Sequence, residues 1–185
     1  MNIEIMKNVY EKHKNLKLAA NEIGVKWQTL YYHLKENNIP VTGDKSKYGS
    51  ATDKLAAKAE LYFKELIPYA KNNNDYQYQA KVDFMVGNLK VDIKSSELHF
   101  SSKKFKSKRW AFSVKKQEFQ ADFIVAFGYE NDNVTIFLFP SETIRYFQTV
   151  SINPYGKSKW LDYSVTKDEL IEFFGMYNSS PNREE

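Results

Sequence analysis

The fold of this chain is decided by one stretch, residues 81–94, which reads KVDFMVGNLKVDIK. Its Gly87-Asn88 dipeptide predicts a two-residue hairpin turn, because glycine accepts the positive φ that the first central position requires. The resulting register forms three apolar pairs on one face of the hairpin, namely Val86 with Leu89, Phe84 with Val91, and Val82 with Ile93. An apolar face of this kind predicts a hairpin at the centre of a sheet.

The opposite face of the same hairpin carries charge. Alternation along the strands sets Asp83 directly across from Asp92, with Lys94 two residues further on that face. Two facing carboxylates repel each other, and a divalent cation between them is the simplest compensation. The alternative is a solvated hairpin face on which two acids tolerate each other.

The segments around the hairpin predict an α/β fold. A helix is expected over 52–67, and Glu60 lies at the edge of its apolar stripe, where a third carboxylate can lean toward the sheet. Strands are expected at 79–86, 89–95, 110–114, 122–129 and 134–139. A short helix is expected over 141–149, and a final one over 166–174 with Gly175 after it.

The spacing of Asp83 and Asp92-Ile93-Lys94, together with the preceding helix, resembles the PD-(D/E)xK nuclease superfamily. Val82 stands where that motif usually has proline. The resemblance is greatest to small phage and group I intron-associated homing endonucleases. It implies a restriction-endonuclease-like core with a mixed central sheet flanked by helices. It also implies that Asp83 and Asp92 bind Mg²⁺, that Lys94 assists the attacking water, and that Glu60 is an auxiliary acid and metal ligand.

The expected activity is therefore metal-dependent hydrolysis of phosphodiester bonds in double-stranded DNA, with Mn²⁺ able to replace Mg²⁺. Lys94 and the basic surroundings suit a phosphate better than a sugar, which disfavours glycosidase chemistry. Two alternatives stay open: a Holliday-junction-type resolvase, and a non-catalytic DNA-binding regulator with an inactive nuclease-like domain. Cleavage of two strands by one-site subunits predicts a homodimer or higher oligomer.

The N-terminal segment predicts a small all-α module. Helices are expected over 3–13, 16–23 and 26–35, and the spacing of Ala20, Gly24 and Leu30 resembles a helix-turn-helix. Five side chains of the third helix are expected to contact DNA, and these are Lys26, Gln28, Thr29, Tyr32 and His33. Trp27 and Tyr31 are expected to be partly core. The alternative is a helical hairpin that packs on its neighbour and never touches DNA.

A second basic region follows the hairpin. Residues 95–116 hold six lysines, one arginine and one acid, whereas residues 117–185 have a net charge of −6. The segment 101–109 predicts a loop that grips the DNA backbone through Lys103, Lys104, Lys106, Lys108 and Arg109. A solvated lysine loop is the alternative.

Composition sets the outer bounds of the prediction. The 185 residues are 42% hydrophobic and contain no cysteine, which excludes disulfides and thiolate metal sites. The N-terminus lacks the features of a signal peptide and no stretch is long enough to span a bilayer, so a soluble cytoplasmic protein is expected. The expected organisation is a helix-turn-helix module at 1–40, a linker at 41–50, a nuclease core at 51–150, a C-terminal extension with a helix at 151–177, and a disordered tail at 178–185.

Overall fold

The structure is a computed structural model that describes residues 2–75, 80–100, 107–114 and 120–178. The chain divides into two compact units. The first contains Met1–Lys54 and Asn73–Ala80, and the second contains Leu55–Asn72 and Lys81–Glu185.

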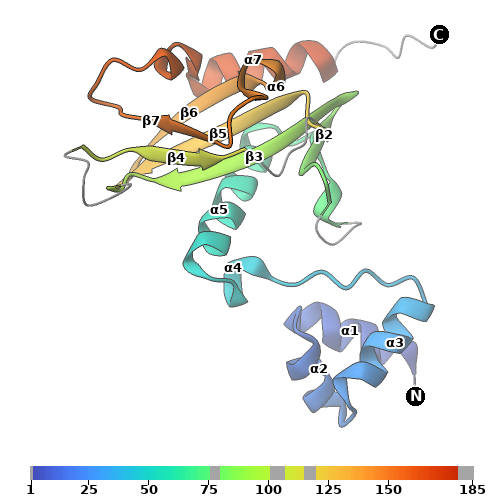
Figure 1. The fold of residues 1–185 in the computed structure, drawn as a ribbon. Coiled ribbons are helices and arrows are strands. Elements are labelled where there is room, and N and C mark those ends of the chain that lie inside the picture. Colours follow the sequence, from blue (N-terminus) through green and yellow to red (C-terminus); the bar gives the residue numbers. More distant parts are fainter. Residues whose placement is uncertain (1, 76–79, 101–106, 115–119, 179–185) are drawn as a thin grey trace. The chain divides into compact units, whose positions relative to one another are not determined.

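Four helices form the first unit (Figure 1), and they are α1 Ile3–His13, α2 Leu16–Ile23, α3 Trp27–Glu36 and α4 Lys45–Tyr48. The first three agree closely with the ranges predicted from apolar spacing. Their shared core consists of Met6, Tyr10, Ala19, Ala20, Leu30 and Leu34. Gly24 ends α2 with a φ of +80°, a left-handed conformation that favours glycine at a helix C-terminus.

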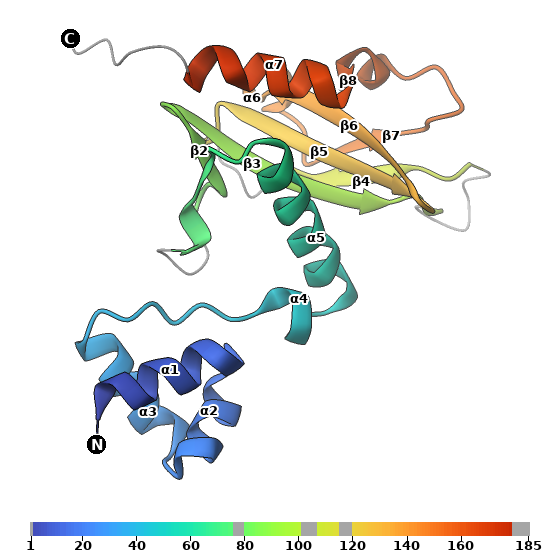
Figure 2. The same cartoon turned by 180° about the vertical axis from the view of Figure 1, so that it is seen from behind.

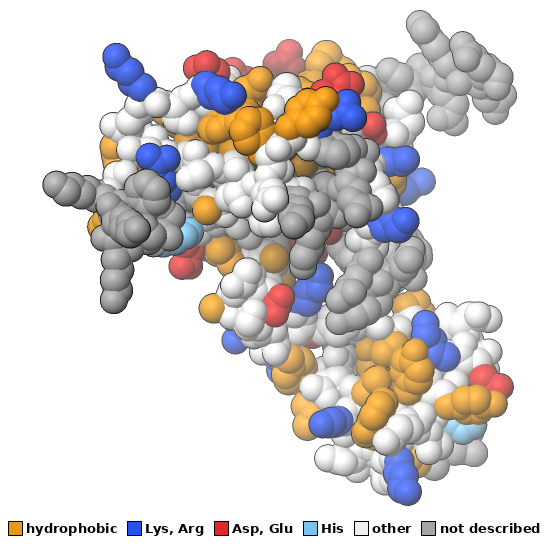
Figure 3. Space-filling model, viewed as in Figure 1, with side chains coloured by type: hydrophobic (Ala, Val, Ile, Leu, Met, Phe, Trp, Pro, Cys, Tyr) orange, Lys and Arg blue, Asp and Glu red, His pale blue; other side chains and the backbone are white. Residues whose placement is uncertain are grey.

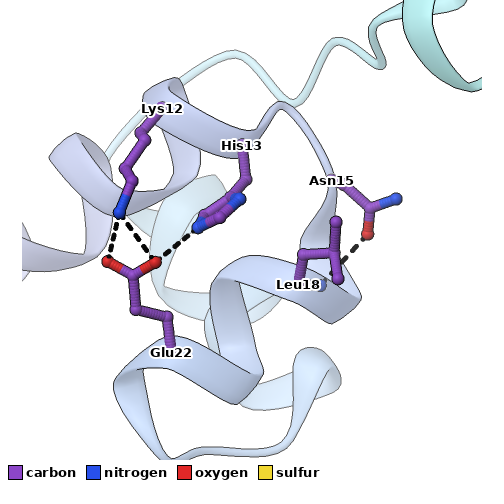
Figure 4. Close-up of polar contacts among 5 residues, drawn as sticks. All are labelled: Lys12, His13, Asn15, Leu18 and Glu22. Atoms are coloured by element: carbon purple, nitrogen blue, oxygen red, sulfur yellow. Dashed lines mark hydrogen bonds and ion pairs between the residues drawn. The ribbon is translucent and has the colours of Figure 1, made fainter.

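Polar contacts fix α1 against α2 (Figure 4). Glu22 of α2 contacts Lys12 Nζ at 2.9 Å and His13 Nε2 at 2.5 Å, both from α1. Asn15 caps α2, since its side-chain oxygen accepts hydrogen bonds from the backbone N–H groups of Lys17 and Leu18. These contacts lie at the surface and orient helices whose packing energy comes from the core.

The segment 41–50, which the sequence predicts to be an irregular linker, contains the short helix α4. Asp44 caps this helix by accepting a hydrogen bond from the Lys47 N–H. The Tyr10 hydroxyl donates a 2.8 Å hydrogen bond to the Thr42 carbonyl. The segment is therefore hydrogen-bonded to α1 at Thr42.

The second unit is mixed α/β with a mostly antiparallel central sheet. Its strand order is β1-β2-β3-β5-β6-β8, and only the β3–β5 pair among the described strands of this sheet is parallel. The strands are β1 Lys71–Asn72, β2 Phe84–Val86, β3 Leu89–Glu97, β5 Phe123–Glu130, β6 Asn133–Pro140 and β8 Ser164–Val165. A separate two-stranded sheet pairs β4 Trp110–Ser113 with β7 Thr149–Ile152.

Two hydrophobic layers enclose the central sheet. On one face, α5 Ala51–Leu66 and α7 Lys167–Asn178 cover it (Figure 2), and Phe63 and Phe174 pack with Val91 and Ile93. On the other face lie the β4–β7 sheet, α6 Ser141–Ile144 and the 3-10 helix η3 Lys159–Tyr163. The 3-10 turn η1 Asn73–Asp75 follows β1 directly.

Several expected boundaries are wrong. The strand expected over 79–86 is formed only at 84–86, and residues 76–79 lie outside the described part of the chain. The helix expected over 141–149 ends at Ile144, and β7 and β8 were not predicted. The last helix continues through Gly175 to Asn178, and Tyr177 packs on Phe173 one turn earlier.

The C-terminal residues 151–177 form part of the core of the second unit. Trp160 packs in the layer of the small sheet, and Leu170 and Phe174 pack in the layer of α5. β8 adds an edge strand to the central sheet through Val165 opposite Ile136. The remaining tail, residues 179–185, lies outside the described residues.

Candidate active site

Asp92 and Lys94 lie on β3, in the middle of the central sheet. Val91 and Ile93 contact the α5 layer, and because side chains alternate along a strand, Asp92 and Lys94 point to the opposite face. Asp92 is 3% exposed. The Lys94 ammonium is 2.5 Å from Asp92 Oδ2, and its side chain is 20% exposed. The pair is a buried acid with a lysine that still reaches solvent.

Asp83 joins this pair by a route that differs from the predicted one. The hairpin register holds for Val86 with Leu89 and for Phe84 with Val91, but the ladder ends at Phe84. Asp83 precedes the strand, and its Oδ2 accepts a 2.8 Å hydrogen bond from the Ile93 N–H. In a continued ladder, that N–H would donate to a main-chain carbonyl of the partner strand. The Asp83 carboxylate therefore takes the place of a backbone acceptor and stays beside Asp92.

The electrostatics of Asp92 follow from its burial. Loss of solvent around the carboxyl raises its pKa from 3.8 to about 7. The Lys94 ammonium lowers the pKa, while the adjacent Asp83 carboxylate raises it. The charged form of Asp92 is therefore costly without a further cation, and two neighbouring carboxylates supply the oxygen donors that Mg²⁺ uses. The residues present fit a divalent cation held by Asp83 and Asp92.

Glu60 does not complete a three-carboxylate cluster with them. It is half-buried on α5, whose neighbours Ala59 and Phe63 pack against the face of β3 that points away from Asp92. Within the described ranges, no group of three or more acids and histidines forms a candidate metal cage. That Glu60 leans toward the sheet as an auxiliary acid and metal ligand stays a prediction.

Two neighbouring polar residues have structural roles. Asp122 accepts a 2.7 Å hydrogen bond from the Lys90 N–H and so ties the start of β5 to β3. Ser96 lies further along the face of Asp92 and Lys94. Its hydroxyl accepts from the Ala111 N–H at 2.9 Å and holds β4 against β3.

The predicted basic segment is the tip of the connection between β3 and β4. His99 and Arg109 close it with two main-chain hydrogen bonds, of 3.1 and 2.7 Å. Lys108 is exposed, and its ammonium lies 5.8 Å from the centre of the Phe100 ring. Lys103, Lys104 and Lys106 lie outside the described residues. His99 is seven positions after Asp92, so an extended chain puts it about 23 Å from Asp92.

The expected DNA-contacting face of α3 is exposed. Lys26, which precedes α3, and Gln28, Thr29 and Tyr32 are all exposed, whereas His33 is half-buried. The Tyr32 hydroxyl donates to Glu36 Oε1 at 2.6 Å, and the ring stacks edge-on with His33. Tyr32 and His33 therefore already make contacts within α3. The polar side chains that remain exposed to a ligand are those at the start of the helix, Lys26, Gln28 and Thr29.

Trp27 and Tyr31 differ from their predicted role as core residues, since each is 41% exposed. Both line a groove of about 950 Å³ in the first unit, together with lysines from three helices. Sequence reasoning missed this groove, although the spacing of Trp27, Tyr31 and Lys35 at successive helical turns is a signal that they share one side of α3.

No protein-family model and no curated protein matches this chain. A solved structure with partial similarity is that of a bacterial homing endonuclease, I-Ssp6803I. The two chains are 18% identical with a TM-score of 0.47, over 66% of this chain and 91% of the other. At this level of similarity, the activity has to be argued from the residues of the chain itself.

Among the described helices, none combines the length and apolar character needed to cross a membrane.

Proposed function

We propose that this protein is a Mg²⁺-dependent DNA endonuclease that hydrolyses phosphodiester bonds in double-stranded DNA. The observation that carries the proposal is that Asp83, held by the Ile93 N–H, lies beside Asp92 and Lys94 of β3, with Asp92 buried and its pKa raised to about 7. A buried acid pair beside a reachable lysine is an arrangement that favours a cation and an anionic substrate together.

Each residue has a distinct task in this proposal. Asp83 and Asp92 would hold the cation through their carboxylate oxygens. When bound, the cation supplies Lewis-acid polarisation of the phosphate and a more acidic water. Lys94 stabilises the negative charge that develops at the phosphate and orients the attacking water. The Ile93 N–H fixes Asp83 and so sets the spacing between the two carboxylates.

Positioning on DNA is assigned to two further surfaces. The polar first turn of α3, with Lys26, Gln28 and Thr29, suits contacts to base edges and phosphates. The β3–β4 tip, with Lys108 and Arg109, suits contacts to the backbone away from the cleaved bond. Whether the natural substrate is a homing site, a restriction site or a branched junction is decided by substrate preference, since the hydrolytic residues serve all three.

The test is cleavage of plasmid and AT-rich genomic DNA in Mg²⁺, and in Mn²⁺ as the expected substitute. Single substitutions Asp83→Ala, Asp92→Ala and Lys94→Ala should each reduce the cleavage rate by at least 100-fold, in line with the loss of a charge-stabilising or metal-holding group. Glu65→Gln, an exposed acid on α5, is the matched control and should cleave like the wild type. Glu60→Gln should lose no more than a few-fold.

Cleavage at discrete positions that disappears in all three variants supports the proposal. Specific DNA binding without cleavage of any linear, supercoiled or branched substrate would overturn it in favour of a non-catalytic regulator. Cleavage restricted to four-way junctions would keep the chemistry and identify a resolvase.

Cutting both strands requires two sites, so we also propose a dimer or larger oligomer on DNA, measurable by analytical ultracentrifugation.

A further inference from the structure

We propose that the groove of the first unit, which is lined by Trp27 and Tyr31 on α3 and by Tyr48 on α4, binds unpaired nucleotides of a nucleic-acid strand. This goes beyond the endonuclease proposal, because it concerns a different surface and holds whether or not the carboxylates cut DNA. The groove has a volume of about 950 Å³ and lies entirely within residues 10–53.

The shape of the groove follows from the packing of the first unit. Its walls are the corner between α1 and α2, one side of α3, and the segment that carries α4. The hydrogen bond from the Tyr10 hydroxyl to the Thr42 carbonyl holds that last segment in place. Trp27, Tyr31 and Lys35 are four residues apart and so follow one another along the wall formed by α3.

The aromatic side chains favour a flat partner. Trp27 and Tyr31 are each 41% exposed, and Tyr48 is 42% exposed. Exposed aromatic rings along a concave surface are typical of sites that stack unpaired bases, because every base offers a π-face. Phosphate groups alone, or the closed edges of a duplex, would leave these rings uncovered.

The charges favour an anionic strand. Four lysines line the groove, and these are Lys14, Lys17, Lys35 and Lys45. In the described part of the first unit, the ion pairs join Glu22 to Lys12 and His13, and none involves the groove lysines. Figure 3 shows hydrophobic side chains next to Lys and Arg on the surface of the N-terminal helices.

The two acids of the groove are already used in helix capping. Asp44 accepts hydrogen bonds from the Ser46 hydroxyl and the Lys47 N–H, and these contacts lower its pKa. Asp53 accepts from both the hydroxyl and the N–H of Ser50. Both carboxylates thus make local hydrogen bonds, and Lys45 also helps to lower the pKa of Asp53, which leaves Lys14, Lys17 and Lys35 to face an incoming ligand. An aromatic and cationic groove is complementary to a single strand with its bases exposed.

The experiment titrates the full-length protein, in EDTA so that no strand is cut, with fluorescein-labelled dT12 and with a 12-base-pair duplex. Trp110 and Trp160 are buried at 3% and 9% exposure, so quenching of intrinsic fluorescence by dT12 reports on Trp27. Stacking on Trp27 or Tyr31 predicts that Trp27→Ala and Tyr31→Ala each weaken dT12 binding at least fivefold. Tyr146→Ala, an aromatic of the second unit that is 86% exposed, is the matched control and should bind normally.

Trp27→Phe separates stacking from folding defects, since it should retain dT12 binding while losing the fluorescence change. Thermal unfolding of each variant identifies a misfolded protein. Binding of dT12 that is equal in wild type, Trp27→Ala and Tyr31→Ala would overturn the proposal. A second result would also overturn it. If inorganic polyphosphate displaces dT12 and the intrinsic tryptophan fluorescence does not change, the groove holds phosphates only. None of these outcomes alters the cleavage test, so the two proposals fail separately.

Discussion

The two candidate sites of this protein are built in opposite ways. The carboxylate site of the second unit buries an acid beside a lysine within a sheet, whereas the groove of the first unit exposes aromatic rings and lysines on helices and a connecting segment. In the first case, the functional groups are also part of the core, so their chemistry and the stability of the fold are coupled. In the second case, the core lies beneath the functional surface, and ligand binding can change while stability does not.

The strongest test of this contrast is the pH dependence of stability. A carboxyl with a folded pKa of about 7 and an unfolded pKa of 3.8 binds its proton more tightly in the folded state. The free energy of unfolding in EDTA should therefore fall by about 3 kcal/mol between pH 4 and pH 7 through Asp92 alone. Denaturant unfolding across this pH range measures the free energy of unfolding of the wild type and of Asp92→Asn. The difference between the two proteins cancels the contribution of the other titrating groups.

The stability of Asp92→Asn should change less with pH over this range than that of the wild type, because the amide does not titrate. Addition of Mg²⁺ should reduce the fall in wild type, because a bound cation stabilises the ionised form. Parallel stability curves for the two proteins would mean that Asp92 is not a buried, proton-binding acid, and the contrast between the two sites would be lost.

A second test concerns the hydrogen bond that fixes Asp83. Asp83→Ala leaves the buried Ile93 N–H without its acceptor, a loss of about 1–3 kcal/mol in the free energy of unfolding. Asp83→Asn keeps an oxygen that can accept the bond and should cost clearly less. Both changes remove the Asp83 charge and should lower the pKa of Asp92, measurable as a shift in the same pH profile. Equal destabilisation by the two substitutions would contradict the role given to this bond.

A third test examines the frame of the groove. Tyr10→Phe removes the hydroxyl that donates to the Thr42 carbonyl and should cost about 1 kcal/mol. Because this bond holds the segment that carries Tyr48, dT12 binding should weaken along with it. Thermal unfolding and fluorescence anisotropy measure the two effects, and a loss of stability with unchanged dT12 affinity would show that the segment does not shape the site.

The smallest expected stability effect belongs to the groove lysines. Lys14→Ala, Lys17→Ala and Lys35→Ala should each change stability by about 0.5 kcal/mol or less. Each lysine that contacts a phosphate should nevertheless reduce the slope of log affinity against log salt for dT12 by about 0.7. Lys157→Ala, an exposed lysine of the second unit, is the control. An unchanged salt slope in all three variants would mean that these lysines do not face the strand.

The parts predicted well from sequence are those governed by local periodicity. The spacing of Met6 and Tyr10, and of Leu30 and Leu34, is sufficient to define the helices of the first unit. The pairing of Phe84 with Val91 follows from the turn and from alternation, and it brings Asp83, Asp92 and Lys94 to one region. Neither inference needs information from distant parts of the chain.

The parts that were missed depend on contacts between distant segments. β7 pairs with β4, where Ile152 lies opposite Trp110 and Val150 opposite Phe112, about 40 residues earlier in the chain. The four residues of β7 are too few to predict a strand by themselves. The groove was also missed, because it brings Tyr48 of α4 together with Trp27 and Tyr31 of α3, which the spacing within α3 cannot reveal.

The position of the acid pair within the chain also has a consequence for protein synthesis. β2 and β3 are adjacent in sequence, so Asp83 and Asp92 can meet in a local hairpin while the chain is still on the ribosome. The parallel partner of β3 begins only at Phe123, and β7, which completes the layer over that face, only at Thr149. Until then Asp92 remains in water with an ordinary acidity. A nascent or truncated chain therefore carries both carboxylates without the buried setting that tunes them, and the site matures only when the last third of the protein has been made.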